Sequence, residues 1–226
     1  MIAAAGSGER LGAGGPKALA PLAGRPMIEW SLEAMRAARS VGAIVVAIPP
    51  GESSVVSPQS SEGVVLVEGG ASRSESVAAA MEKVETEYVV VHDAARPLVT
   101  AALVDAVVDD LAQDENCAAV VAAVPVSDTV KQVARGREVD RTLDRSSLWA
   151  AQTPQAFRAE VLREALASTK LLAQATDDAM LVERLGRTVL LHEAPGENVK
   201  VTTPLDLRLA ELLLAERHND ERGGAE

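Results

Sequence analysis

Cysteine and aromatic residues are scarce in this sequence. Among 226 residues there is one cysteine, Cys117, and Phe, Tyr and Trp together account for 2%. A single cysteine excludes a disulfide framework within the chain, and it excludes a zinc site built from several cysteines. Hydrophobic residues still make up 47%, so the core has to consist mainly of Ala, Val and Leu. That composition favours a sheet of Val-rich parallel strands covered by Ala- and Leu-rich helices.

Positive charge is also in short supply. The 22 Lys and Arg residues are outnumbered by 33 Asp and Glu residues, which gives a formal net charge of -11. This balance argues against nucleic acid or an anionic membrane as the main partner, because both favour clustered Lys and Arg. A small anionic ligand remains compatible, since it responds to a few cations close to its site.

Long apolar runs are missing too. No stretch approaches the length that crosses a membrane, and no basic leader precedes the glycine-rich start. We therefore expect a cytoplasmic protein. A length of 226 residues suits one substantial domain, and we expect residues 1–226 to form it.

What the sequence does contain begins with a glycine-rich segment at residues 3–17, AAAGSGERLGAGGPK. Glycines let the backbone approach an anion and offer its N–H groups, while Arg10 and Lys17 add positive charge. The first three glycines are spaced G-x-G-x-x-x-G, which matches neither the dinucleotide-binding pattern nor the P-loop pattern. Taken alone, the segment leaves open a phosphate cradle and an ordinary flexible turn between a strand and a helix.

Short apolar segments alternate with helical patterns along most of the chain. We expect strands at residues 1–5, 43–48, 64–67, 88–91, 118–126 and 188–192, and helices at residues 26–35, 72–81, 101–111, 160–167, 176–182 and 203–216. Such alternation predicts an α/β fold, a Rossmann-like and mostly parallel sheet with helices on both faces. The alternation breaks at about residues 127–150, where polar residues between short β-like pieces indicate a protruding β-arm.

Polar residues follow directly after the expected strand at residues 88–91. They form the run His92-Asp93-Ala94-Ala95-Arg96-Pro97. Ligands of open α/β sheets bind beyond the carboxyl ends of the strands, so this run is a candidate site together with the glycine-rich segment. Ser72 and Glu75 have the spacing of a capping box, and ordinary helix capping explains most of that serine-rich segment.

Taken in order, these motifs match one family over nearly the whole chain. The matching segments are residues 4–11, 16–17, 69–70 with Arg73 and Ser76, 92–97, 128–131, 152–155, 176–179 and 200–202. The sequence closely resembles the 2-C-methyl-D-erythritol 4-phosphate cytidylyltransferases of isoprenoid precursor biosynthesis, which are nucleotidyltransferases. It departs from the family at Ala3, where a proline is usual, and at Ala71, where many members carry a polar or acidic residue.

The resemblance implies a reaction of CTP with 2-C-methyl-D-erythritol 4-phosphate that gives 4-CDP-2-C-methyl-D-erythritol and pyrophosphate. The substrate phosphate attacks the α-phosphorus of CTP in line, with Mg2+ or another divalent cation present. No protein base is needed, because a phosphate monoester is largely ionised near neutral pH. The resemblance also implies a homodimer whose arm completes an active site shared between two subunits.

Individual roles follow from the same resemblance. The implied catalytic residues are Arg10, Lys17, Arg145 and Lys200. The implied nucleotide-binding residues are Ala4, Ala5, Gly6, Gly8, Gly70, Ser76 and Asp93. The implied residues for the acceptor, the alcohol phosphate, are Asp93, Arg96, Thr129 and Thr176. Metal ligands stay undetermined, with Asp93 as the candidate. We assign His92 no catalytic role, and we interpret Asp178 as a charge that complements the dipole of its helix.

Three alternatives compete with this interpretation. The first is the same chemistry on another acceptor such as ribitol 5-phosphate, which the second alanine of the His92-Asp93-Ala94-Ala95-Arg96 run disfavours. The second is a regulator that binds CTP without turnover. The third is a nicotinamide-dependent dehydrogenase, which the spacing of the glycines disfavours.

Overall fold

A seven-stranded sheet forms the centre of the protein. The structure is a computed structural model that describes residues 1–6, 15–52, 55–57, 60–167 and 175–223. In the sheet order β11-β7-β10-β6-β1-β4-β5, the strands are β11 (Thr188–Glu193), β7 (Cys117–Pro125), β10 (Trp149–Arg158), β6 (Tyr88–Asp93), β1 (Ile2–Ala3), β4 (Ile44–Ile48) and β5 (Val64–Glu68). Within this sheet, only the two pairings of β10 are antiparallel. The expected mostly parallel α/β sheet is therefore confirmed.

Burial on both faces explains the composition of the central strands. All five residues of β4 are buried, and β7 is buried from Cys117 to Ala123, so these strands are continuously apolar rather than alternating. β1 has only two residues, as its weakly β-forming alanines would suggest. It is held in the sheet by parallel pairing with both β4 and β6.

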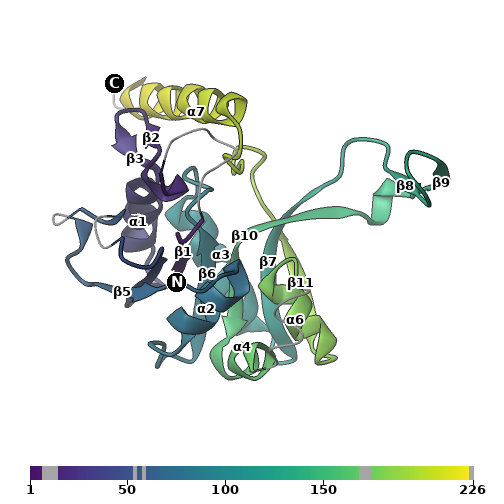
Figure 1. Ribbon diagram of the computed structural model, residues 1–226, viewed down its shortest axis with the longest axis horizontal. Helices are drawn as coiled ribbons and strands as arrows, with labels where there is room; N and C mark the ends of the chain where they lie inside the picture. Colours follow the sequence, from purple (N-terminus) through teal and green to yellow (C-terminus); the bar gives the residue numbers. More distant parts are fainter. Residues whose placement is uncertain (7–14, 53–54, 58–59, 168–174, 224–226) are drawn as a thin grey trace.

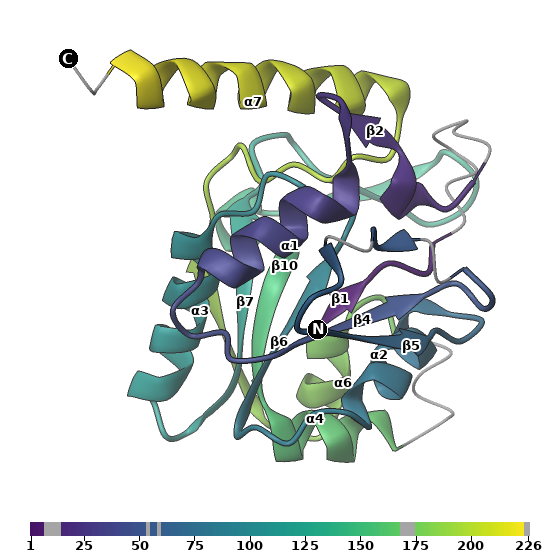
Figure 2. The same ribbon diagram turned by 90° about the vertical axis from the view of Figure 1, so that its left-hand side faces the viewer.

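Helices cover both faces of the sheet (Figure 2). One face carries α1 (Met27–Ala37) and α3 (Ala101–Gln113), and the other carries α2 (Arg73–Met81), α4 (Ala159–Leu166) and α6 (Asp178–Arg184). The long helix α7 (Pro204–Gly223) lies across one end of the sheet and packs on Leu22, Met27 and Leu98. No helix in the described parts of the chain is both long enough and apolar enough to span a membrane.

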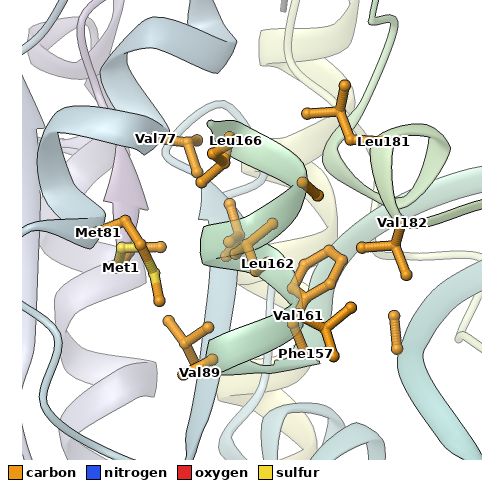
Figure 3. Packing of buried hydrophobic residues seen from close by; sticks show 14 of the residues in the cluster. Met1, Val77, Met81, Val89, Phe157, Val161, Leu162, Leu166, Leu181 and Val182 are labelled. Atoms are coloured by element: carbon orange, nitrogen blue, oxygen red, sulfur yellow. The ribbon is translucent and has the colours of Figure 1, made fainter. Parts of the chain in front are cut away.

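The core on the α2–α4–α6 face is built around the only phenylalanine of the chain. Phe157 is completely buried and belongs to a cluster with Val89, Leu162, Leu181 and Val182 (Figure 3). Its ring comes from β10, while its neighbours come from β6, α4 and α6. One large side chain therefore packs two strands of the sheet against the two helices that cover them.

The strand β10 and one hairpin were not expected from the sequence. β10 contains Pro154, which normally argues against a strand inside a sheet. The register of β10 against β7 shifts between Ala151 and Gln155, so the proline sits in an irregularity where its missing N–H costs no ladder hydrogen bond. The second element is a hairpin of β2 (Pro21–Leu22) and β3 (Arg25–Pro26), whose turn holds Ala23 at a φ of 49°.

The predicted arm is present. β8 (Lys131–Val133) and β9 (Val139–Thr142) form a small antiparallel ribbon, followed by the short 3-10 helix η5 (Arg145–Ser147). Figure 1 shows the ribbon at the end of a long extension away from the sheet. Val133, Val139 and Trp149 are exposed on it at 52%, 53% and 39%, which leaves apolar surface on the arm without cover from the described parts of its own chain.

Candidate active site

A cavity of about 640 Å³ opens beyond the carboxyl ends of β1 and β6. The segment after β1, the 3-10 helix η2 (Lys17–Leu19), the start of α2 and the segment before α7 all contribute to its lining. The lining includes eight of the residues expected from the sequence: Ala4, Ala5, Gly6, Lys17, Gly70, Ser76, Asp93 and Lys200. Three cations, Lys17, Arg73 and Lys200, line the cavity together with Asp93, the sole acidic residue among the described lining residues. The cavity therefore suits an anionic ligand.

The glycine-rich segment is closed at its base by a backbone hydrogen bond. The Lys17 N–H donates to the Gly6 carbonyl at 3.0 Å, which brings the two described ends of the segment together at the cavity. Residues 7–14, with Gly8 and Arg10, lie outside the described residues. Lys17 thus enters the site from η2 directly beside the end of β1.

Asp93 is the centre of the charged cluster. Its Oδ1 accepts a hydrogen bond from Arg73 Nε at 2.7 Å, and its Oδ2 accepts one from Lys200 Nζ at 2.6 Å. Burial raises the pKa of this carboxyl, but the positive charges and hydrogen bonds of Arg73 and Lys200 outweigh burial and leave the pKa well below its usual range. Asp93 is therefore a carboxylate that fixes two cations at the cavity wall.

Arg73 bridges Asp93 to a second carboxylate. Its Nη1 donates to Asp178 Oδ2 at 2.7 Å, and the Asp178 side chain is 0% exposed. Burial raises the pKa of Asp178, and the positive charge of Arg73 offsets part of that rise. Asp178 does begin α6, but Asp177 is the residue that caps the helix, by accepting from the Met180 N–H. The expectation that Asp178 only complements the helix dipole is wrong, because its carboxylate pairs with a cavity residue 105 positions away.

A buried hydrogen-bond chain supports the end of β6. The Asp93 N–H donates to Thr153 Oγ1 at 3.0 Å, and Thr153 Oγ1 lies 3.2 Å from His92 Nδ1. His92 Nε2 lies 3.1 Å from the Arg96 carbonyl, so this nitrogen carries the proton and Nδ1 accepts. Burial lowers the pKa of His92 to about 4, which keeps the ring neutral. His92 is thus a buried residue that supports the end of β6.

Arg96 is buried and holds the segment that carries Lys200. It is 7% exposed, and its Nη1 donates to the Asn198 carbonyl at 2.7 Å. The Val201 N–H donates to the Ala95 carbonyl at 2.8 Å. Both bonds hold the segment that carries Lys200, while Arg96 itself is not part of the described cavity lining. The structure therefore places Arg96 away from the position expected for a substrate contact.

The Gly69-Gly70 pair lets two parts of the wall approach closely. A Cβ at Gly69 would lie 2.7 Å from both Ala5 Cβ and Ser76 Oγ, and one at Gly70 would lie 2.4 Å from Glu75 Cβ. The expected capping box of Ser72 and Glu75 is present at the start of α2. Ser76 lines the cavity, and its Oγ donates to the Ser72 carbonyl at 2.9 Å, which leaves the hydroxyl its capacity to accept a hydrogen bond.

Comparison with known proteins shows the family of this chain. The family model for IspD, 2-C-methyl-D-erythritol 4-phosphate cytidylyltransferase, matches residues 1–216. The chain belongs to the IspD family. Relatives with that enzyme's name include a protein of Prochlorococcus marinus (strain MIT 9313), 40% identical over 97% of this chain and 99% of the relative, and one of Nocardia farcinica (strain IFM 10152), 46% identical over 96% of this chain and 94% of the relative.

Solved structures of the IspD family have the same fold. The Thermus thermophilus enzyme of that name superimposes with a TM-score of 0.76 at 38% identity, covering 94% of this chain and 96% of the other. The 4-diphosphocytidyl-2C-methyl-D-erythritol synthase of Anaerococcus prevotii gives a TM-score of 0.81 at 27% identity, covering 95% and 96%.

Besides Arg96, three expected site residues of this IspD chain lie away from the described cavity lining. Thr129 and Arg145 belong to the arm, where both are exposed and Arg145 donates to the Ser127 carbonyl. Thr176 is exposed near the start of α6, with its Oγ1 3.6 Å from Met180 Sδ. None of the three is among the described residues that line the cavity. Thr202, which received no role from the sequence, does line it, and its place two residues after Lys200 in a matching motif is the signal that could have found it.

A metal ion at this IspD site would depend on its ligand for most of its coordination. Among the described residues, no group of three or more His, Cys, Asp or Glu side chains is placed to hold one. Magnesium typically binds through one or two carboxylates together with phosphate oxygens and water. Asp93 is the sole carboxylate of the described lining, and its two oxygens also bind Arg73 and Lys200, so such an ion would take most of its ligands from phosphate oxygens and water.

Proposed function

We propose that this protein is a cytidylyltransferase. It converts CTP and 2-C-methyl-D-erythritol 4-phosphate to 4-CDP-2-C-methyl-D-erythritol and pyrophosphate in isoprenoid precursor biosynthesis. The observation that carries the proposal is the charged cluster of Lys17, Asp93, Arg73 and Lys200 around one cavity in a chain of the IspD family. In the same proposal, residues 1–226 act as a single nucleotidyltransferase domain.

The cavity explains how two anions are brought together. Both substrates are phosphates, and negative charge builds up at the α-phosphorus when one attacks the other. Lys17, with Arg10 from the same glycine-rich segment, stabilises that charge at the end of β1. Lys200, fixed by Asp93 at 2.6 Å, holds the acceptor phosphate for in-line attack. No side chain has to remove a proton, because the attacking oxygen is already ionised.

Backbone groups that line the cavity recognise the nucleotide. The backbone of Ala4, Ala5, Gly6, Gly8 and Gly70, together with the Ser76 hydroxyl, contacts CTP in this proposal. The close approach of Gly69 to Ala5 and Ser76 supports it, since only glycine allows this wall to form. A divalent cation, with Asp93 as its protein ligand, would neutralise triphosphate charge when bound.

We further propose a homodimer in which the arm of each subunit completes the site of the other. Arg145 and Thr129 would then hold the acceptor phosphate bound in the cavity of the partner subunit, while Arg96 supports the segment that carries Lys200. Two observations support this: both arm residues lie outside the described cavity lining of their own chain, and the arm carries exposed Val133, Val139 and Trp149. The enzyme is cytoplasmic in this proposal, since both substrates are small water-soluble anions.

A complementation experiment tests the shared site. Lys17→Ala and Arg145→Ala are prepared separately, each with low activity, and then mixed under conditions that exchange subunits. If the arm acts in the partner's site, each mixed dimer has one site with both Lys17 and Arg145 intact. Equal mixing then recovers about a quarter of wild-type activity, because half of the dimers are mixed and half of their sites are intact. Unchanged low activity after exchange would contradict sharing.

Pyrophosphate release tests the reaction itself. The assay contains CTP, Mg2+ and either 2-C-methyl-D-erythritol 4-phosphate or ribitol 5-phosphate, with ATP and UTP as nucleotide controls. Release only with CTP and the methylerythritol phosphate is the expected result. Release with ribitol 5-phosphate would mean that the reaction type is as proposed but that the acceptor is a different alcohol phosphate. A folded protein that binds CTP without any release would instead be a regulator.

A further inference from the structure

Asp178 lies behind the cavity wall and contacts it through Arg73. Its side chain is 0% exposed, and Oδ2 accepts from Arg73 Nη1 at 2.7 Å. Its other oxygen, Oδ1, has no hydrogen-bond partner among the described residues. A buried carboxylate is expensive unless it is paired. The pair with Arg73 is therefore the contact that makes this charge tolerable, and it fixes the direction in which Arg73 points.

Arg73 in turn shares its charge between two carboxylates. Its Nε donates to Asp93 Oδ1 at 2.7 Å while its Nη1 is held by Asp178. The fixed fork of a guanidinium makes this bridge rigid. Asp93 has its remaining oxygen, Oδ2, on Lys200 Nζ at 2.6 Å. Asp178, Arg73, Asp93 and Lys200 thus form a continuous chain of alternating charges from the buried start of α6 to the cavity.

Arg73 and Lys200 differ in how much positive charge they can offer to a ligand. Arg73 is 27% exposed and is engaged by two acids, so little of its charge is left for a ligand. Lys200 is 42% exposed and has Asp93 as its ion-pair partner, so a phosphate can approach its ammonium group. If Arg73 lost Asp178, its guanidinium could turn toward Asp93 or toward the cavity, and the Asp93 carboxylate would no longer be held in place beneath Lys200.

We propose that Asp178 is a positioning residue for Lys200. It anchors Arg73, which orients Asp93, which places the Lys200 ammonium for the acceptor phosphate. The kinetic consequence rests on the proposed cytidylyltransferase function, whereas the placement of Lys200 does not.

The first test is kinetic and uses a matched neighbour as control. Asp178→Asn keeps the size of the side chain and removes its charge. We expect kcat/KM for the acceptor to fall about tenfold, mainly through KM. Asp177→Asn changes the adjacent carboxylate, which caps α6 and accepts from Gln155. Because asparagine caps helices about as well as aspartate, this variant should stay within about twofold of wild type.

A double-mutant cycle distinguishes positioning from a general structural role. If Asp178 acts through Arg73, then Arg73→Ala combined with Asp178→Asn lowers kcat/KM no further than Arg73→Ala alone. Independent effects would multiply, and that result would overturn the proposal. Arg73→Lys provides a second variant that does not change a buried residue. A lysine ammonium group cannot bridge two carboxylates as the forked guanidinium of arginine does. Arg73→Lys should therefore also reduce kcat/KM about tenfold.

The second test probes the position of Lys200 by chemical labelling and does not depend on catalytic turnover. An amine-acylating reagent is applied to the folded protein, and the labelling rates of Lys200 and of the exposed Lys83 are compared by peptide mass spectrometry. Asp178→Asn and Arg73→Lys should each raise the labelling rate of Lys200 relative to Lys83 several-fold. Asp93→Asn, which removes the ion-pair partner of Lys200 itself, should raise it as well, and Asp177→Asn should leave it unchanged. An unchanged ratio in both Asp178→Asn and Arg73→Lys would overturn the proposal. Absence of turnover in the wild type would instead overturn the proposed function.

Discussion

Replacing Gly69 with alanine should destabilise the protein and distort the nucleotide wall of the cavity. The new Cβ would lie 2.7 Å from Ala5 Cβ, 2.7 Å from Ser76 Oγ and 3.2 Å from the Ile48 carbonyl. Carbon atoms pack at about 3.5–4.0 Å, so the wall has to open by about 1 Å. Ala5 Cβ is attached directly to the backbone, and the Gly69 N–H is held by Ile48 at 2.7 Å. Neither side can give way by a simple change of rotamer.

The magnitude follows from two opposing effects. Forcing extra volume into a packed region costs about 1–3 kcal/mol. Removing a glycine from the unfolded chain gains about 0.4–1 kcal/mol. The free energy of unfolding should therefore fall by about 1–2 kcal/mol. Because both Ala5 and Ser76 line the cavity, the affinity for CTP should also fall, by about tenfold if about 1.4 kcal/mol of the distortion appears in binding.

Gly42→Ala is the matched control. Gly42 is exposed, does not have a positive φ, and has no heavy atom within 4 Å of the position that an added Cβ would take. Its replacement should leave stability unchanged or raise it by up to about 1 kcal/mol. Urea unfolding followed by circular dichroism measures the first quantity, and titration calorimetry with CTP measures the second. A Gly69→Ala variant within about 0.5 kcal/mol of Gly42→Ala, with unchanged CTP affinity, would show that the close approach at Gly69 matters neither for stability nor for nucleotide binding.

Three further predictions concern single side chains. The His92 pKa of about 4 in the folded protein lies below the ordinary value of about 6.5, so the unfolded chain binds the proton first and stability falls by up to about 3 kcal/mol as pH drops from about 6.5 to 4. Urea titrations of His92→Gln should show a flatter decline over that range, and an equal slope would count against the assignment. Phe157→Ala should cost about 3–5 kcal/mol in urea unfolding, whereas a loss below about 1.5 kcal/mol would mean that the core had repacked. Lys17→Ala should lower kcat/KM at least about 100-fold with unchanged stability, and near-normal turnover would remove Lys17 from the reaction.

Local patterns were enough to predict most elements of the fold. The continuous apolar run of β4 and the capping box at Ser72 depend on neighbours in sequence, and both are present as expected. The β2–β3 hairpin was missed because alanine rarely adopts a positive φ, and Ala23 does so only in its tertiary setting. β10 was missed because Pro154 hides a strand whose irregular register is decided by its pairing with β7.

Single sequence motifs predicted only part of the candidate site. Lys17, Asp93 and Lys200 were expected and share one cavity. The role of Asp178 was not, because its pairing with Arg73 joins positions 105 residues apart and the run Thr176-Asp177-Asp178 also fits an ordinary helix start. Arg145 is the opposite case. Its sequence motif predicts a site residue, but within one chain the residue lies on the arm.

Transfer of a cytidylyl group to an alcohol phosphate at this cavity can be followed by 31P NMR of a single reaction. The sample holds the wild-type protein, CTP, Mg2+ and 2-C-methyl-D-erythritol 4-phosphate. We expect the triphosphate and monoester signals to disappear together, while a coupled diphosphate pair and free pyrophosphate appear in equal amounts. Spectra that show CDP and orthophosphate with the monoester unchanged, or no reaction at all, would rule out this transfer.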